Sequence, residues 1–152
     1  FYVGRNDIHD NGENSVDIKE ASDVVISENR LHDEPLGPIV LHDCPVNAAV
    51  IFNEVYGADY GVSMASLEAN CDDEIPVTLF VLGNDFHDIT GNGAEAWGSG
   101  KRYFIASNTF ARVSTAIAVD PRGAGSQVSE DTSAFEAGAA AFEAVYGVDI
   151  RP

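Results

Sequence analysis

The sequence is poor in basic residues. Eight lysines and arginines stand against 25 aspartates and glutamates, which gives a formal net charge of −17. Proteins that bind nucleic acids neutralise phosphates with lysine and arginine, so this balance excludes a nucleic-acid partner, and the same repulsion excludes anionic membrane surfaces. The apolar runs are far shorter than the ~18 to 20 residues of a membrane-spanning helix, and no signal peptide is visible.

Cysteine is scarce as well. Cys44 and Cys71 are the only two and do not form a CxxC pair. They form either one disulfide, which an even count in a secreted chain permits, or two buried thiols. The acidic residues are scattered along the chain, which favours a solubility role in a saline setting over a cation site. The length of 152 residues indicates one domain, and because the chain opens on Phe1 we expect a processed product or a fragment.

What the sequence does have is an internal repeat. The segment VVISENRLHD, residues 24–33, returns in altered form as YVGRNDIHD, AVIFNEVYG, FVLGNDFHD and FIASNTFAR. One asparagine keeps its place in every copy, and successive copies are 23, 24, 31 and 24 residues apart. The aligned residues are Asn6, Asn29, Asn53, Asn84 and Asn108. A nearly fixed spacing of this kind is typical of a repeat architecture.

The residues around each asparagine alternate between apolar and polar. Apolar residues occupy the positions three before and two after it in every copy, and a second apolar pair precedes most copies, as in SVDIK and PIVLH. Alternation with a period of two predicts short strands with one buried face, and the Gly, Asn, Asp and Pro residues between them predict turns. Each repeat is therefore expected to contain about three short strands.

A stack of coils accounts for the constant asparagine. If each repeat forms one coil, equivalent strands pair in parallel at a spacing of about 4.8 Å. The asparagine is then expected at a bend between two strands, where it tolerates left-handed backbone torsions. Its side-chain amide is expected to hydrogen-bond to the equivalent amides one coil away, because buried polar groups need partners. The sequence thus predicts an all-β parallel β-helix of about five coils over residues 1–120.

The last segment, residues 121–152, has a different pattern. PRGAGSQ predicts a loop, and SAFEAGAAAFEAVYG predicts a helix with Ser133 and Glu136 as its capping box and Gly147 as its C-terminal cap. The expected apolar side of this helix comprises Phe135, Phe142, Val145 and Tyr146. Because exposed sheet ends invite aggregation, we expect the helix to cap the open end of the stack within the same domain.

The coil phrase VDIKEASDVVISENRLHD resembles the recurring motif of the right-handed parallel β-helix proteins, the pectate-lyase-like superfamily. The resemblance covers about residues 1–120 and implies a right-handed coil. In the polysaccharide lyases of this superfamily the substrate groove runs along the first sheet, a Lys or Arg often acts as the base, and Ca²⁺ held by carboxylates neutralises the uronate. The resemblance therefore implies a carbohydrate-active protein, secreted or at the cell surface.

Only outward side chains are available for chemistry on such a fold. On the first strand of successive coils, Lys19 and His42 are expected in one outward column and Asp17 and Ser63 in the next. VDIKE resembles the position of a lyase base, which makes Lys19 the candidate base and His42 the candidate acid. The candidate substrate-binding residues are Asp17, Asp43, Ser63 and Trp97. The chain departs from the lyase pattern because no Arg follows in the next coil, and a solvated Lys19 is the alternative.

Three histidine–aspartate pairs share one position of the repeat. They are His9–Asp10, His32–Asp33 and His87–Asp88. Stacked imidazoles and carboxylates suit a transition metal, but the coil between the second and third pairs carries Tyr56 and Gly57 instead. Because Asp favours turns, the pairs are interpreted as a solvent-facing column of turn residues.

The longest insertion in the repeat is ASLEANCDDEIPV, residues 65–77. Its hard oxygen donors suit Ca²⁺, with a plain acidic loop as the alternative. The candidate ligands are Glu68, Asp72, Asp73 and Glu74. A disulfide between Cys44 and Cys71 would pin this loop. Trp97 ends DITGNGAEAW, which is interpreted as a Gly-rich turn, and it either stacks on a sugar ring or packs at a coil corner.

The leading hypothesis is an extracellular β-helix domain that binds or cleaves an acidic polysaccharide, by lyase-type β-elimination with Ca²⁺ if it is an enzyme. The chain has no GxSxG, P-loop, dinucleotide-binding or HExxH motif that would indicate another chemistry. The alternative is a non-catalytic surface, adhesive or fibre-forming module that self-associates through its open N-terminal coil. Fold alone does not decide between them.

Overall fold

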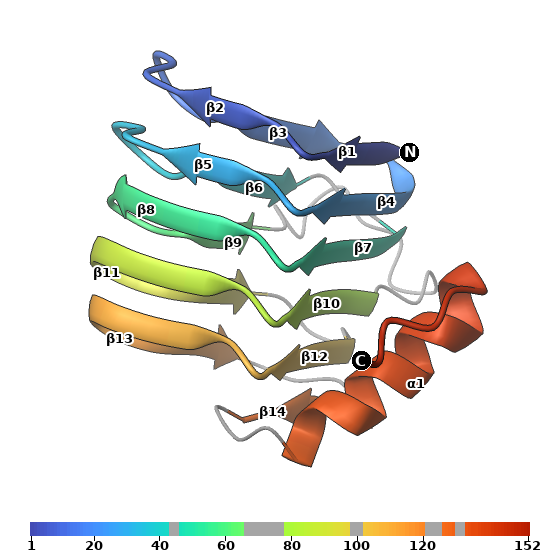
Figure 1. The fold of residues 1–152 in the computed structure, drawn as a ribbon. Coiled ribbons are helices and arrows are strands. Elements are labelled where there is room, and N and C mark those ends of the chain that lie inside the picture. The colour runs from blue at the N-terminus through green and yellow to red at the C-terminus, as the bar shows by residue number, and fades with distance from the viewer. Residues whose placement is uncertain (43–45, 66–77, 98–101, 121–125, 130–132) are drawn as a thin grey trace.

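The chain winds into a parallel β-helix of about four turns (Figure 1). The computed structural model describes residues 1–42, 46–65, 78–97, 102–120, 126–129 and 133–152. The strands are β1 (Tyr2–Gly4), β2 (Asp7–His9), β3 (Val16–Lys19), β4 (Ser22–Ser27), β5 (Arg30–His32), β6 (Ile39–His42), β7 (Val46–Ile51), β8 (Glu54–Ala58), β9 (Val62–Ala65), β10 (Thr78–Leu82), β11 (Asp85–Trp97), β12 (Arg102–Ala106), β13 (Thr109–Asp120) and β14 (Gln127–Val128). The helix among the described residues is α1 (Ser133–Tyr146). The predicted parallel β-helix with a C-terminal helix is confirmed.

Each full turn contributes one strand to each of three faces. Strands β1, β4, β7, β10, β12 and β14 form a six-stranded sheet. The other two faces, β2–β5–β8 and β3–β6–β9, belong to one larger sheet because β11 runs through both of them. Its residues 85–89 pair with β8 and its residues 94–97 pair with β9. The long strand β13 follows β11 in parallel over both parts.

Like apolar residues stack in columns inside the coil. The register of the six-stranded sheet places Val3, Ile26, Val50, Val81 and Ile105 opposite one another in successive strands. The last four of these side chains are fully buried. Burying a Val or Ile side chain contributes roughly 1.5 to 3 kcal/mol relative to leaving it exposed. The alternation of apolar residues thus fixes which side of each strand faces the interior.

The asparagines form a continuous hydrogen-bonded ladder at one corner of the coil. At each step the backbone N–H and the side-chain Nδ2 of one asparagine both donate to Oδ1 of the asparagine in the next coil, at 2.9–3.0 Å. The members are Asn6, Asn29, Asn53, Asn84 and Asn108, and all except Asn6 are buried. Nδ2 also donates to a backbone carbonyl, as Asn53 does to Ile26 O at 3.0 Å. The ladder thereby satisfies polar groups that are expensive to leave unpaired in the interior.

The left-handed residue at this corner is the one before the asparagine. The residues directly before the ladder asparagines all have φ between 54° and 67°; they are Arg5, Glu28, Phe52, Gly83 and Ser107. None of the five ladder asparagines has a positive φ. The expectation that asparagine itself takes the left-handed torsion is therefore wrong. The left-handed residue varies in type because its backbone makes the bend, whereas the next position must be Asn because its amide makes the bonds.

The segment DITGNGAEAW is strand and not the expected turn. It forms the second half of β11, with a shift of register between Ile89 and Asn92 where the strand bends. Glycine is required nearby because neighbouring coils approach closely. A Cβ on Gly61 would lie 2.4 Å from Gly93 O, and a Cβ on Gly93 would lie 2.6 Å from a ring carbon of Phe110. Glycine within a strand marks such a close approach as readily as a turn.

Helix α1 lies against the outer face of the six-stranded sheet, beside β10 and β12, and not across the end of the stack (Figure 1). The outward residues of these strands are apolar, and Phe142 packs edge-on to Phe80 with ring centroids 5.7 Å apart. Strands buried on both faces have continuous apolar sequences, as TLFVL and RYFIA show. The sequence pattern therefore does not reveal that a second layer covers them.

The apolar side and the C-terminal cap of the helix follow the sequence with one exception. Phe135, Phe142 and Tyr146 pack against the sheet, whereas Val145 is 40% exposed. Gly147 has φ 70°, and its N–H donates to Glu143 O at 2.8 Å, which is the geometry of a glycine cap. The side chain of Ser133, half of the predicted capping box, lies outside the described residues.

The ladder yields a first prediction. Asn53→Ala removes the acceptor of both Asn29 donors in the buried middle of the ladder. Since each buried group left unpaired costs about 1 to 3 kcal/mol, we expect urea denaturation to show a loss of about 3 kcal/mol in the free energy of unfolding. Asn6→Ala is the matched control. Asn6 is exposed, and its Oδ1 accepts no ladder bond, so the loss there should stay below about 1 kcal/mol. Equal losses would contradict the role of the ladder.

Candidate functional site

The face formed by β3, β6, β9 and the second half of β11 carries the side chains that the sequence nominates for chemistry. Asp17 and Lys19 point outward from β3, and the register places Lys19 opposite His42 and Asp17 opposite Val40. Ser63 continues the row of Val40 and is followed by Glu95 on β11. We call this surface the polar face. Its rows are aligned because equivalent residues of successive coils share one register.

Asp17 binds both of its neighbours on the polar face. Its Oδ1 lies 2.6 Å from His42 Nε2, and its Oδ2 lies 3.7 Å from Lys19 Nζ. The Lys19 side chain is 56% exposed. A lysine that acts as a base is normally desolvated or placed beside another cation. Lys19 is solvated and next to a carboxylate, so its surroundings match a surface ion pair.

A second hydrogen-bonded group lies two coils further along the same face. Ser63 Oγ donates to Glu95 Oε1 at 2.6 Å, and Asn92 Nδ2 donates to Glu95 Oε2 at 2.7 Å. Glu95 and Asn92 were missed from the sequence because DITGNGAEAW was interpreted as a turn. The alternation of Ala94, Glu95 and Ala96 is the signal that would have identified a strand with Glu95 pointing outward.

Several nominated residues lie outside the part of the chain that the structure describes. Among them are Asp43, both cysteines, Cys44 and Cys71, and the proposed Ca²⁺ ligands Glu68, Asp72, Asp73 and Glu74. For Trp97 the structure describes the backbone, which pairs with Ala65 on β9 and with Asp120 on β13. The disulfide, the acidic-loop Ca²⁺ site and the sugar-stacking role of Trp97 stay predictions.

The face formed by β2, β5, β8 and the first half of β11 carries a ladder of stacked rings. The rings belong to His9, His32, Tyr56 and His87, with centroids 4.8, 4.5 and 4.6 Å apart and interplanar angles of 15° or less. The sequence suggested that Tyr56 interrupts the histidine column, but its ring continues it. Because the rings lie face to face along the coil axis, their edges and not their faces are presented outward.

Each histidine of the ring ladder is held by the aspartate that follows it. The Nδ1 atoms of His9, His32 and His87 lie 2.7–2.8 Å from an Oδ2 of that aspartate. All three aspartates have positive φ and form the turn at the end of the strand. The prediction that these pairs lie in turns is therefore correct for the aspartates. It did not anticipate that the histidines stack in an ordered array.

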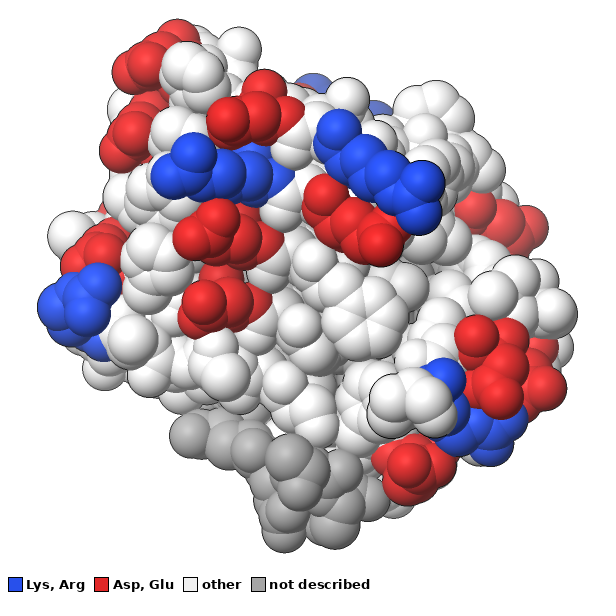
Figure 2. All heavy atoms as spheres, viewed as in Figure 1, with Lys and Arg blue, Asp and Glu red and all other residues white. Residues whose placement is uncertain are grey.

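Neighbouring charged groups shift the pKa values of His87, the last ring of the ladder, and of Asp88 beside it. The Arg112 guanidinium, and after it His87, holds the pKa of the Asp88 carboxyl well below its usual range. Burial lowers the pKa of His87, but hydrogen bonds to Asp88 and Glu54 outweigh this effect, so its pKa is raised overall. Figure 2 shows acidic and basic side chains close together over strands β11 and β13, on the left of the view.

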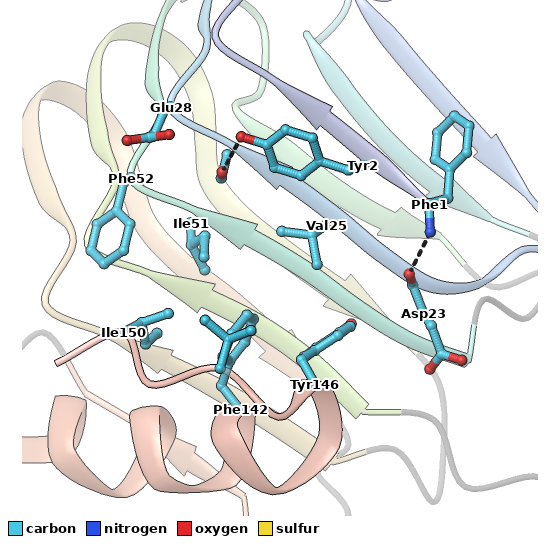
Figure 3. Close-up of a pocket in the computed structure, with 12 residues that line it drawn as sticks. Phe1, Tyr2, Asp23, Val25, Glu28, Ile51, Phe52, Phe142, Tyr146 and Ile150 are labelled. Atoms are coloured by element: carbon cyan, nitrogen blue, oxygen red, sulfur yellow. Dashed lines mark hydrogen bonds between the residues drawn. The ribbon is translucent and has the colours of Figure 1, made fainter.

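An apolar groove of about 510 Å³ lies between the two ends of the chain (Figure 3). Phe1, Tyr2 and Val25 form one wall, and Phe142 and Ile150 form the opposite wall. No sequence pattern indicates this groove, because one wall comes from β1 and β4 and the other from helix α1 and the residues that follow it.

Comparison of the chain with protein-family models, with curated proteins and with solved structures finds no match. The observed parallel β-helix agrees with the fold that the pectate-lyase-like resemblance implies, but membership of that superfamily stays a prediction. Within the described residues, α1 lacks the length and apolar character that crossing a bilayer requires. Function has to be argued from the side chains on the surface.

A second prediction concerns His87. Asp88→Asn keeps a residue that tolerates the left-handed turn but removes the charge that raises the histidine pKa, so an NMR titration should show the His87 pKa falling. The raised pKa means that protonated His87 stabilises the fold fully below about pH 6.5, and this stabilisation is lost as the pH rises through the folded-state value. Glu54→Gln is the control, with a smaller fall because Glu54 is 3.4 Å away. An unchanged His87 pKa in Asp88→Asn would refute the pairing.

Proposed function

We propose that this chain is a polysaccharide-binding β-helix domain whose binding surface is the polar face. The observation that carries the proposal is the pair of hydrogen-bonded groups on that face, Asp17 with His42 and Lys19, and Glu95 with Ser63 and Asn92. Both groups offer donors and acceptors of the kind that sugar hydroxyls use. They lie on a sheet surface that is regular from coil to coil, which suits an extended, repetitive ligand.

The environment of Lys19 favours binding over cleavage. Lyase-type β-elimination needs a base of lowered pKa and a cation that stabilises the developing charge. Lys19 is solvated beside Asp17, and His42 is engaged by the same carboxylate. We therefore assign Lys19 and His42 to ligand binding and assign no catalytic step to the polar face.

The proposed ligand is an acidic polysaccharide bound with Ca²⁺. A chain with a net charge of −17 repels a polyuronate directly, and the acceptors on the polar face include the carboxylates of Asp17 and Glu95. Carboxylate oxygens are hard ligands that suit Ca²⁺. A Ca²⁺ ion held by one of these carboxylates and by a uronate of the ligand would turn repulsion into attraction. A ligand of this kind places the protein outside the cell, secreted or at the cell surface.

A third prediction tests this proposal. After treatment with a chelator and addition of Ca²⁺, the protein should bind polygalacturonate, as measured by calorimetry. Addition of EDTA should abolish this binding. The double variant Asp17→Asn, Glu95→Gln should weaken binding at least about tenfold, because it removes the two hard-ligand carboxylates of the face. Glu28→Gln with Asp85→Asn is the matched control, since it removes the same charge from other faces and should leave binding within about twofold.

Three results would overturn the proposal. Absence of binding with Ca²⁺ would remove the ligand class, and equal losses in the two double variants would show only nonspecific electrostatics. An increase in ultraviolet absorbance from unsaturated product would show that the chain is a lyase and that the non-catalytic assignment is wrong.

Self-association is the second candidate function, favoured by the unpaired edges of β1, β2 and β3. Within the described residues these strands end their sheets, so each presents a row of unpaired backbone groups (Figure 1). Such edges are templates for pairing with another copy. A second chain added there would continue the sheets in an adhesive or fibre-forming assembly.

A fourth prediction concerns this assembly. Light scattering at rising protein concentration should show a growing molar mass, more strongly in high salt, because salt screens the repulsion between copies of charge −17. A monomer at all concentrations and salt levels would contradict self-association.

A further inference from the structure

The first two steps of the ring ladder bring together two imidazoles and a carboxylate. Asp7 and His9 project from the same side of β2, and His9 is paired in register with His32 on β5. One ligand atom from each of Asp7, His9 and His32 lies within 4.8 Å of the other two. Residues two apart on one strand and equivalent residues on adjacent strands are the nearest neighbours that a sheet surface offers.

Both imidazoles are oriented as metal-binding histidines usually are. His9 Nδ1 lies 2.8 Å from Asp10 Oδ2, and His32 Nδ1 lies 2.7 Å from Asp33 Oδ2. A metal-ligating histidine almost always donates its other ring N–H to a carboxylate or carbonyl, which fixes the tautomer and raises the basicity of the ligating nitrogen. With Nδ1 acting as the donor, Nε2 of each ring keeps its lone pair for a metal.

The surroundings of His32 call for a cation. Its Nε2 lies 3.0 Å from Asp7 Oδ1, while its Nδ1 is already bound to Asp33. A neutral imidazole has a single N–H, so contacts to carboxylates at both nitrogens need either a second proton or a metal ion. The His32 side chain is only 11% exposed, which strengthens electrostatic interactions there. Arg30 Nη1 lies 3.8 Å from the other oxygen of Asp7 and so does not occupy Oδ1.

The framework that holds these groups is rigid. The ring of His32 is stacked between those of His9 and Tyr56. The turn after His9 is fixed by Glu34, a 2% exposed carboxylate that accepts hydrogen bonds from the backbone N–H and Nδ2 of Asn11 at 3.0 and 2.8 Å. Side chains held on strands by packing and outer hydrogen bonds lose little freedom when they bind an ion.

We propose that Asp7, His9 and His32 bind a divalent transition-metal ion of the Zn²⁺ type through the Asp7 carboxylate and Nε2 of both histidines. Imidazole with carboxylate suits Zn²⁺, Cu²⁺ and Ni²⁺, whereas Ca²⁺ and Mg²⁺ prefer oxygen ligands alone. Three protein ligands leave at least one position for water or for a ligand from solution. This site is independent of the polar face and of the Ca²⁺-dependent binding proposed there.

The other end of the ring ladder supplies an internal control. His87 is held by Asp88 in the same way, and Glu54 is its second carboxylate neighbour. The ring stacked beside it is Tyr56, which offers no imidazole nitrogen. One imidazole and one carboxylate make a weaker site than two imidazoles and a carboxylate. His87→Ala therefore removes a histidine of the same ladder without touching the proposed ligands.

A fifth prediction concerns this metal site. In the experiment, Zn²⁺ and Co²⁺ are added separately to the full chain after treatment with a chelator. Calorimetry should show one Zn²⁺ bound per chain, and Co²⁺ should develop visible absorption bands typical of nitrogen and oxygen ligation. His9→Ala and Asp7→Asn should each weaken Zn²⁺ binding at least about tenfold, since each removes a direct ligand. His87→Ala should bind Zn²⁺ within about twofold of the unaltered chain.

Thermal unfolding distinguishes loss of the site from loss of the fold. Metal-free His9→Ala should unfold near the temperature of the metal-free unaltered chain, because His9 is exposed on an edge strand. Zn²⁺ should raise the unfolding temperature of the unaltered chain and of His87→Ala but not that of His9→Ala. Failure of the unaltered chain to bind Zn²⁺ or Co²⁺, or equal weakening in His9→Ala and His87→Ala, would overturn the proposal.

Discussion

A parallel β-helix has to satisfy its polar groups at every corner, where the chain leaves one sheet and enters the next. At the corner where the chain leaves the six-stranded sheet, one column of asparagine amides does so. From Asn29 onward each Oδ1 accepts two hydrogen bonds from the preceding coil, so a slip of one residue in these coils would break both bonds and also turn the apolar side chains outward. The ladder and the apolar columns therefore demand the same register, and the stacked rings and outward polar rows follow from it.

The two outward faces use this register for different chemistry. On the polar face, the carboxylates of Asp17 and Glu95 are at the centre of hydrogen-bonded groups that suit sugar hydroxyls and bridging cations. On the opposite part of the larger sheet, the rings stack on one another, so a sugar ring finds no open aromatic face except at an end. What that surface offers is ring edges with nitrogen atoms beside carboxylates, which is the chemistry of a transition-metal site.

The repeating part of the fold was predictable because stacking puts like residues over like, and the sequence records this as columns. The structure departs from the prediction where one residue type fits two structures or where the sequence pattern is ambiguous. Continuous apolar runs such as TLFVL do not show which residues face outward, so the docking surface of α1 was hidden. Position 93 of strand β11 is a glycine because the ring of Phe110 passes close to it, yet a glycine in the sequence alone suggests a turn.

The candidate sites were predictable only in part, for a related reason. The rows containing Asp17 and Lys19 follow from the period of two and from the repeat length. The cluster of Asp7, His9 and His32 depends on side-chain rotamers and on contacts between coils, and the residue types alone equally suit a plain turn column. Tyr56 breaks the pattern of histidines in the sequence, but it continues the stack because stacking requires only a flat ring.

NMR couplings across hydrogen bonds test the asparagine ladder most directly. The account predicts correlations from the backbone nitrogens of Asn29, Asn53 and Asn84 to the side-chain carbonyl carbon of the asparagine in the next coil, together with slow exchange of these amide protons. Correlations from these amides to other acceptors, or rapid exchange without any such correlation, would contradict the claim that stacked amides set the register of the coil.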